Sequence, residues 1–221
     1  PSARELTLMA FDPVNGGVLL YGGLATVGTA SIGLADTWSY DGTNWVQNLT
    51  GSHPSGRSDN VMAYDEGRER IVMHGGYNDA LQFLGDTWEY AGTNWQQIST
   101  PHTPGPVADP GITYDRGLGR IVLFGGKQSW VTPNTNQTFV YDGADWTDIT
   151  PTLSGGPSAR WVAQMVYDEA RGRSVAFGGI DNFNQFPGDT WELVTPGVAV
   201  HHSFGHGCPG THGKPQLLLA D

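Results

Sequence analysis

The stretch VMAYDEGRERIVMHGGYNDALQFLGDTWEYAGTNW (residues 61–95) contains one unit of a pattern that this chain of 221 residues repeats four times. A short apolar run ends in Asp65, a second run ends in a Gly-Gly doublet, a third opens with Asp-Thr-Trp, and a last Trp follows. The doublets recur at intervals of 53, 50 and 53 residues: Gly22-Gly23, Gly75-Gly76, Gly125-Gly126 and Gly178-Gly179. A period near ~50 residues is typical of propellers made of four-stranded blades. We therefore expect an all-β protein with four such blades.

The first two strands of each unit are nearly continuous apolar runs, as in strands that neighbouring blades cover on both faces. We expect the propeller to span residues 1–197, with blades at about 1–52, 53–103, 104–153 and 154–204. The fourth unit lacks the final Trp, and residues 198–221 form a Gly/His-rich tail that includes part of its last strand. The repeat leaves three arrangements open: a closed four-bladed ring, part of a larger ring, or two chains that pair into eight blades.

Charge and hydropathy exclude some classes of partner. The formal net charge is −11, and no run of Lys or Arg occurs. Such a surface repels phosphate backbones and anionic lipids, so we expect neither nucleic acid nor membranes as partners. No segment approaches the ~20 apolar residues that a membrane-spanning helix needs.

The repeated unit resembles the Kelch repeat. Its marks are the Gly-Gly doublet followed by a Tyr and a Trp at a fixed distance, here Tyr40 and Trp45, Tyr90 and Trp95, and Tyr141 and Trp146. The resemblance covers residues 1 to about 197 and implies a Kelch-type β-propeller. Galactose oxidase also has Kelch blades and uses a copper site with a Tyr–Cys crosslink. The only cysteine here, Cys208, lies outside the blades, so we expect no cofactor, no metal and no catalytic residue of that kind.

Three arginines, Arg4, Arg57 and Arg160, each stand eight residues before the Asp that ends the first strand of a unit. They could line a central channel and clamp an acidic ligand through paired hydrogen bonds. Alternatively, each pairs with a carboxylate that also recurs, namely Asp36, Asp86 or Asp189. We favour the structural role, because a residue present in most units usually serves the unit.

The loops after the Gly-Gly doublets differ between units, and in propellers such loops crowd one face around the axis. They span residues 24–35, 77–85, 127–137 and 180–188. Three of them combine aromatic side chains with amides and acids, a composition suited to stacking on sugar rings and binding their hydroxyl groups. The candidate ligand-binding residues are Tyr77, Asn78, Asp79, Trp130, Asn134, Asp181, Asn182, Phe183 and Asn184. The alternative is that Trp130 and Phe183 fold back and cover the blade tops.

The tail gathers His201, His202, His206, Cys208 and His212. Imidazole and thiolate groups are good zinc or copper ligands, but this spacing matches no closed structural site, so we expect no metal. Residues 204–218 resemble the initial segment of C-terminal modules in large secreted bacterial proteins. That resemblance implies a secreted protein cut within such a module. Residues 217–220 would then form a strand able to pair with a sheet edge.

The sequence thus predicts a secreted, non-catalytic binding or assembly module that recognises a glycan or an extracellular protein through these loops. One alternative is a glycan-active enzyme with loop carboxylates, for which Asp79, Asp181 and Asp189 are the candidates. Another is a structural subunit of an extracellular filament or coat that self-associates through its tail.

Overall fold

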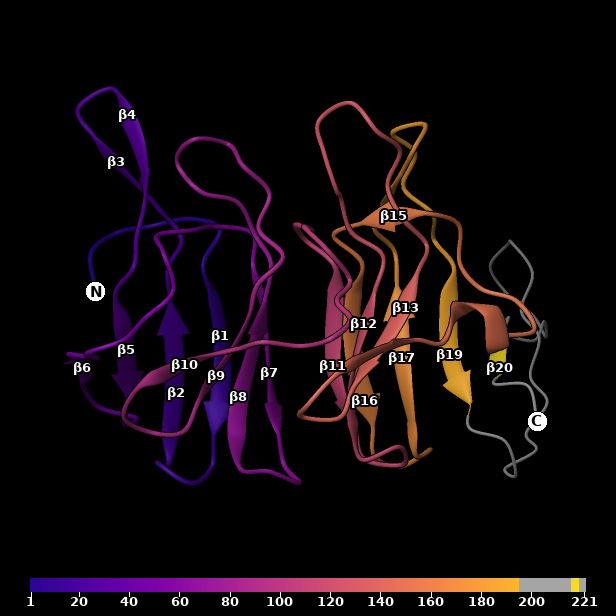
Figure 1. The fold of residues 1–221 in the computed structure, drawn as a ribbon, viewed down its shortest axis with the longest axis horizontal. Helices are drawn as coiled ribbons and strands as arrows, with labels where there is room; N and C mark the ends of the chain where they lie inside the picture. Colours follow the sequence, from indigo (N-terminus) through magenta and orange to yellow (C-terminus); the bar gives the residue numbers. More distant parts are fainter. Residues whose placement is uncertain (195–215, 219–221) are drawn as a thin grey trace.

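The computed structural model describes residues 1–194 and 216–218 and shows a β-propeller arrangement of four blades (Figure 1). Each blade is a four-stranded sheet whose first strand is innermost. Blade 1 consists of β1 (Leu8–Asp12), β2 (Gly17–Tyr21), β5 (Thr37–Tyr40) and β6 (Trp45–Asn48). Blade 2 consists of β7 (Val61–Asp65), β8 (Arg70–His74), β9 (Thr87–Tyr90) and β10 (Trp95–Ile98). Blade 3 consists of β11 (Gly111–Asp115), β12 (Arg120–Phe124), β13 (Thr138–Tyr141) and β14 (Trp146–Asp148). Blade 4 consists of β16 (Gln164–Asp168), β17 (Arg173–Phe177), β19 (Thr190–Val194) and β20 (Gln216–Leu218).

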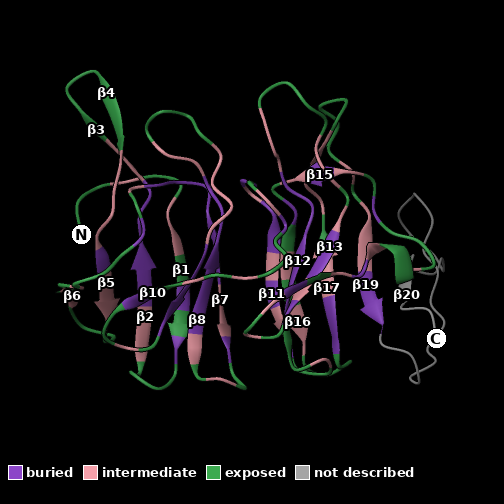
Figure 2. Ribbon diagram, in the orientation of Figure 1, coloured by how far each residue is buried: buried purple, intermediate pink, exposed green. Residues whose placement is uncertain are grey.

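The core lies between the blades, so β8 and β12 of the two central blades are almost wholly buried (Figure 2). One cluster joins Leu19 and Tyr21 of blade 1 to Met73 and Trp95 of blade 2. An equivalent cluster joins blade 2 to blade 3, and a smaller one joins blade 3 to blade 4. Two-sided burial explains why these strands read as unbroken apolar runs rather than as an alternation.

The Gly-Gly doublets provide a backbone conformation that other residues rarely adopt. Gly75 and Gly76 have φ angles of 74° and 92°. A Cβ atom on Gly75 would lie 2.1 Å from the carbonyl oxygen of Val107 in the next blade. Gly76 also donates its N–H to that carbonyl at 2.8 Å. The doublet therefore closes the second strand and hydrogen-bonds the following blade at a distance that no side chain permits.

Arginine–aspartate pairs brace three of the blades. Arg57 donates to both carboxylate oxygens of Asp86, at 2.7 and 2.9 Å, and to the carbonyl of Gly75 at 3.0 Å. The indole N–H of Trp88 donates to the same carboxylate at 2.6 Å. The pairs Arg4–Asp36 and Arg160–Asp189 repeat this geometry. The guanidinium groups are almost fully buried, so they hold together the segments of their own blade.

A tryptophan on the outer strand locks each of two blades to the one before it. Trp95 Nε1 donates to Thr37 Oγ1 at 3.0 Å, and Trp146 Nε1 donates to Thr87 Oγ1 at 2.9 Å. Blade 4 has no such tryptophan, and the buried Thr138 Oγ1 of blade 3 finds no hydrogen-bond partner within residues 1–194 and 216–218. The outer position of blade 4 is filled by β20, which pairs parallel to β19, whereas the other ladders within the blades are antiparallel. The strand expected within residues 198–204 lies outside the described residues.

Several short elements decorate the blades. The loop at residues 24–35 forms a hairpin, β3 (Leu24–Val27) and β4 (Ala30–Gly33), which the sequence analysis treated only as a variable loop. In blade 4, β15 (Arg160–Trp161) pairs with β18 (Ile180–Asp181). A single turn of 3₁₀ helix, η1 (Thr150–Thr152), follows blade 3.

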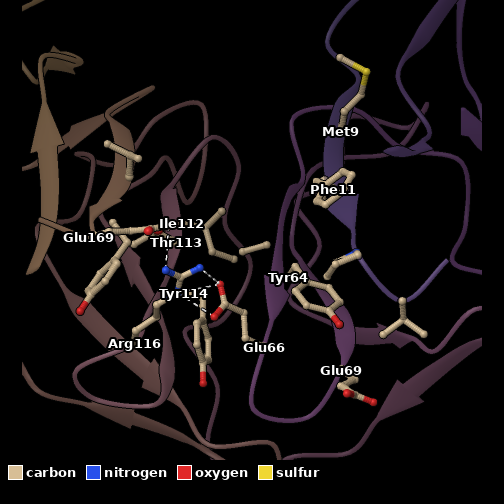
Figure 3. A pocket seen from close by; sticks show the side chains of 16 residues that line it. Met9, Phe11, Tyr64, Glu66, Glu69, Ile112, Thr113, Tyr114, Arg116 and Glu169 are labelled. Carbon is tan, nitrogen blue, oxygen red and sulfur yellow. Dashed lines mark hydrogen bonds and ion pairs between the residues drawn. The ribbon is translucent and has the colours of Figure 1, made fainter. Parts of the chain in front are cut away.

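The inner strands line a groove of about 980 Å³ (Figure 3). Successive inner strands pack against one another in the order β1, β7, β11 and β16. Within the described residues, no packing of comparable extent joins β1 to β16. Figure 3 shows Met9 and Phe11 of blade 1 on one side of the groove and Glu169 of blade 4 on the other. Arg116 bridges Glu66 and Glu169 at 2.7 and 2.8 Å and so links blades 2, 3 and 4 along the groove.

Candidate binding site on the loop face

The segment before each inner strand pairs with the residue that follows the Gly-Gly doublet. Bridges of this kind join Glu5 to Leu24, Ser58 to Tyr77 and Ala108 to Lys127, and the β15–β18 ladder is the equivalent in blade 4. The backbone is therefore the same at each blade, while the side chains differ. A binding site specific to this protein is therefore expected where the side chains of one blade differ from those at the same position in the other blades.

One position in each of these segments has a positive φ angle although it is not glycine. The four residues are Leu6, Asp59, Asp109 and Val162, with φ between 50° and 57°. A chain of backbone hydrogen bonds links them from blade to blade: Asp59 N–H to Leu6 O at 3.4 Å, Asp109 N–H to Asp59 O at 2.9 Å, and Val162 N–H to Asp109 O at 2.8 Å. Valine in this conformation is a genuine outlier. The strain thus comes from the contact between blades, whatever the side chain.

Blades 2 and 3 place carboxylates at this position. Asp59 is buried, and Asp109 is partly buried beside it. Burial and the nearby charge of Asp59 raise the pKa of Asp109 to about 8, although the positive charge of Lys127 acts in the opposite direction. At neutral pH the Asp109 carboxyl is therefore mostly protonated and can donate a hydrogen bond. Next in the chain, Asn60 buries its side-chain amide, and in the described part of the chain neither Nδ2 nor Oδ1 has a hydrogen-bond partner.

Aromatic side chains from three blades surround this carboxyl pair. Tyr77, Phe83 and Trp130 form a triangle with ring centroids 5.2 to 6.0 Å apart. Lys127 Nζ lies 4.7 Å from the ring centroid of Trp130 and 4.7 Å from that of Trp161. Half of the surface of Trp130 is still exposed. We call these five residues, together with Asp59 and Asp109, the loop-face cluster.

The loop-face cluster can bind a ligand that has both apolar and hydroxyl-bearing faces. The rings offer a flat apolar wall, whose aromatic faces also attract C–H groups and cations. The Asp109 carboxyl shares its proton with Asp59, so an oxygen of this pair can accept a hydrogen bond, and the Lys127 ammonium can donate one. The rings constrain one another through their contacts, so little conformational entropy is lost on binding.

The structure brings together only two of the sequence-predicted residues in this cluster, Tyr77 and Trp130. Asn78 holds its own loop, because its Oδ1 accepts from the N–H groups of Ala80 and Gln82 at 3.0 and 3.1 Å. The carboxylate of Asp79 accepts from the N–H of Gly33 and so ties this loop to the β3–β4 hairpin. Both residues therefore support the cluster from behind rather than line it.

The remaining predicted residues form a second group in the loops of blades 3 and 4. Asn134 donates its N–H to Asn182 Oδ1 at 2.6 Å. Asp181 accepts from the N–H groups of Phe183 and Gln185, both at 2.8 Å, and from Asn184 through its backbone carbonyl. Phe183 projects outward with 81% of its surface exposed, so it does not cover the blade top. The polar atoms of this loop are largely occupied by the loop itself.

Sequence reasoning missed Asp59, Asp109, Lys127, Phe83 and Trp161. Asp59 and Asp109 stand two residues after Arg57 and Val107, where the other two units have Leu6 and Val162. That change from apolar to acidic residues is visible once the units are aligned, but it lies before the inner strand rather than in the loops after the Gly-Gly doublets. Lys127 and Trp161 draw attention only through their three-dimensional contact.

Over the described part of the chain, no three His, Cys, Asp or Glu side chains gather in a way that could hold a metal ion. The histidines and the cysteine of the tail lie outside that part. No helix among the described residues is long and apolar enough to cross a membrane. Comparison of the chain with protein-family models and with curated proteins finds no match.

Proposed function

We propose that this chain is a Kelch-type propeller from a secreted protein and that it binds a carbohydrate ligand at the loop-face cluster. The repeated doublets, tyrosines and tryptophans support the Kelch assignment, and the tail sequence supports secretion. The observation that carries the binding function is the aromatic triangle of Tyr77, Phe83 and Trp130 next to the Asp59–Asp109 pair.

A carbohydrate suits this arrangement better than a flat aromatic or a strongly charged ligand. Pyranose rings have an apolar C–H face that stacks on Trp and Tyr, and equatorial hydroxyl groups that need donors and acceptors at the rim. Lys127 and Asp59 offset one another, so the site has no large excess of either charge. The net charge of −11 also disfavours polyanionic glycans, so we expect neutral oligosaccharides.

The test is a glycan-array screen of the full chain, followed by calorimetric titration of the best neutral hit. Trp130→Ala removes the most exposed wall of the cluster and should weaken binding at least ~10-fold, which corresponds to about 1.4 kcal/mol. Phe183→Ala, at a more exposed aromatic residue outside the cluster, serves as the control and should leave the affinity unchanged. Equal losses in both variants, or binding only to a protein ligand, would contradict the proposal.

A second candidate function is glycoside hydrolysis, and the pKa of Asp109 favours it. Two neighbouring carboxyl groups of which one stays protonated near neutral pH can act as general acid and base or nucleophile. This candidate moves the catalytic role from Asp79, Asp181 and Asp189 to Asp59 and Asp109, because Asp79 and Asp181 cap loops and Asp189 pairs with Arg160. Release of reducing sugar by the wild type, lost in Asp109→Asn with affinity retained, would identify an enzyme. Binding without turnover would leave the module non-catalytic.

A further inference from the structure

Blades 1 and 4 each have one face that no neighbouring blade covers. In blade 2, alternate residues of β7 face opposite neighbours: Met62 and Tyr64 join the core shared with blade 1, whereas Val61 joins the core shared with blade 3. Met9 and Phe11 of β1 occupy the repeat positions of Met62 and Tyr64. Within the described chain, no blade precedes β1, and 58% of Met9 and 59% of Phe11 are exposed, against 7% of Met62.

The opposite face of blade 4 is uncovered in the same way. Phe177 occupies the repeat position of Tyr21, His74 and Phe124. These three are at most 3% exposed because the next blade covers them, whereas Phe177 is 55% exposed. Val166 is 62% exposed, although its counterpart Thr113 is buried. Exposed apolar groups gathered on one sheet face indicate an interaction surface.

The exposed residues of blades 1 and 4 occupy the same repeat positions as the residues that form the interfaces between neighbouring blades of one chain. Tyr21 meets Trp95 of the next blade with ring centroids 5.1 Å apart, and His74 meets Trp146 at 5.3 Å. Phe177 has no such tryptophan against it, and the described residues contain no blade that Trp45 of blade 1, the counterpart of Trp95 and Trp146, could contact in the same way. Thr37 and Thr87 accept from those tryptophans, and Thr190 is their counterpart in blade 4. Blade 4 therefore complements blade 1.

We infer that two copies of this chain associate, with blade 4 of each against blade 1 of the other, and close a ring of eight blades. A two-fold axis generates both junctions at once and leaves no blade face uncovered. Eight blades lie within the range that propellers adopt. Met9, Phe11 and Val166, which line the groove between β1 and β16 in one chain, are covered by the blades of the second copy in this ring.

The experiment is multi-angle light scattering of the full chain over a range of concentrations in 150 mM salt, where the repulsion between two chains of charge −11 is screened. We expect twice the chain mass of 23.7 kDa. Phe11→Lys and Phe177→Glu, each on one uncovered face, should each shift the protein to monomer. Phe183→Lys adds the same charge at an exposed phenylalanine of a blade 4 loop and should leave the dimer intact. Circular dichroism verifies that each variant is folded.

Mixing the two variants distinguishes loss of this interface from a general folding defect. Equal amounts of Phe11→Lys and Phe177→Glu can form a pair with one wild-type junction and one Lys–Glu junction, so we expect the dimer mass to return. A wild-type monomer at all concentrations, a dimer that persists in both variants, or no recovery on mixing would each overturn the inference. Masses that grow without limit would also overturn it, because they indicate a contact that does not close into a ring.

Discussion

Trp146 Nε1 donates a hydrogen bond to Thr87 Oγ1 at 2.9 Å, across the boundary between blades 3 and 2. Thr87 also meets His74 Nδ1 at 3.0 Å, so one hydroxyl joins three buried side chains. The counterpart hydroxyl in blade 3, Thr138 Oγ1, has no partner among the described residues, and blade 4 lacks the tryptophan that would donate to it. The threonine at this repeat position therefore accepts a hydrogen bond from a tryptophan in blade 2 but not in blade 3.

This difference predicts opposite outcomes for one substitution. Thr87→Val leaves the indole N–H of Trp146 buried without an acceptor and should lower the free energy of unfolding by about 1–3 kcal/mol. Thr138→Val removes a hydroxyl that is already unpartnered and should be neutral or stabilising. Urea denaturation of the two variants and the wild type measures both effects. Equal losses would show that the hydroxyl of Thr138 does find a partner in solution.

The Arg57–Asp86 pair should make the stability of the protein fall at low pH. Burial alone would raise the pKa of Asp86, but the hydrogen bonds and charge of Arg57 and the Trp88 N–H outweigh it and hold this pKa below its usual value of 3.8. A carboxyl group whose pKa is lowered on folding stabilises the protein above its unfolded pKa and loses that effect as the pH falls through the folded value.

Asp86→Asn should therefore cost about 3 kcal/mol at pH 7, because it leaves the buried guanidinium of Arg57 without its counter-charge. Its difference from the wild type should shrink as the pH falls below 3.8, because the unfolded chain then protonates Asp86 more readily than the folded protein does. Glu69→Gln, at an exposed turn, is the control for charge alone. Denaturant unfolding at pH 7, 5 and 3 tests the trend, and a pH-independent difference would contradict it.

His74 should make the fold sensitive to milder acid. Its ring is fully buried, and burial lowers its pKa from 6.5 to about 4 despite the hydrogen bond to the Gly105 carbonyl. Between those values the unfolded chain binds the proton more readily, so stability falls as the pH decreases from about 6.5 towards 4.

The matched substitution is His74→Phe, because Phe124 occupies the same position in blade 3. Between pH 7 and pH 5 the wild type should lose about 2 kcal/mol more than this variant does. Denaturant unfolding at the two pH values gives the difference directly. An identical pH dependence for both proteins would show that His74 is accessible to protons in the folded state.

Asp109 should make the free energy of unfolding depend on pH in the opposite direction. Its carboxyl has a pKa raised to about 8 in the folded protein, chiefly by burial and then by Asp59. The folded state binds more protons than the unfolded state between pH 3.8 and 8, so this group lowers stability as the pH rises through that range. Asp109→Asn should be less destabilised than the wild type when the pH is raised from 6 to 8.5. Chemical denaturation at both pH values tests this, and parallel losses would contradict it.

The repeated parts of this molecule were predictable from sequence because each is fixed by local chemistry. The Gly-Gly doublets, the Asp-Gly turns and the apolar strand pairs each occur in several units, and the structure confirms the four blades that they predict. The structure also pairs Arg57 with Asp86, the carboxylate that the repeat places beside it.

The parts that escaped prediction depend on contacts between distant segments. The strand expected at residues 217–220 is found as β20 on a sheet edge, but its parallel pairing with β19 joins residues more than 20 positions apart, and no repeat predicts it. The loop-face cluster combines Asp59 of blade 2 with Lys127 of blade 3 and Trp161 of blade 4. No spacing rule within one unit predicts a site assembled from three.

The chain of backbone hydrogen bonds through Leu6, Asp59, Asp109 and Val162 has a consequence for how this fold can acquire new specificity. Because neighbouring blades impose the positive φ angle, the backbone conformation at that position does not depend on the side chain. Aspartate and asparagine tolerate this conformation better than leucine or valine. An asparagine can therefore be introduced at residue 6 or 162 with less backbone strain, and the polar rim can be extended around the axis one blade at a time.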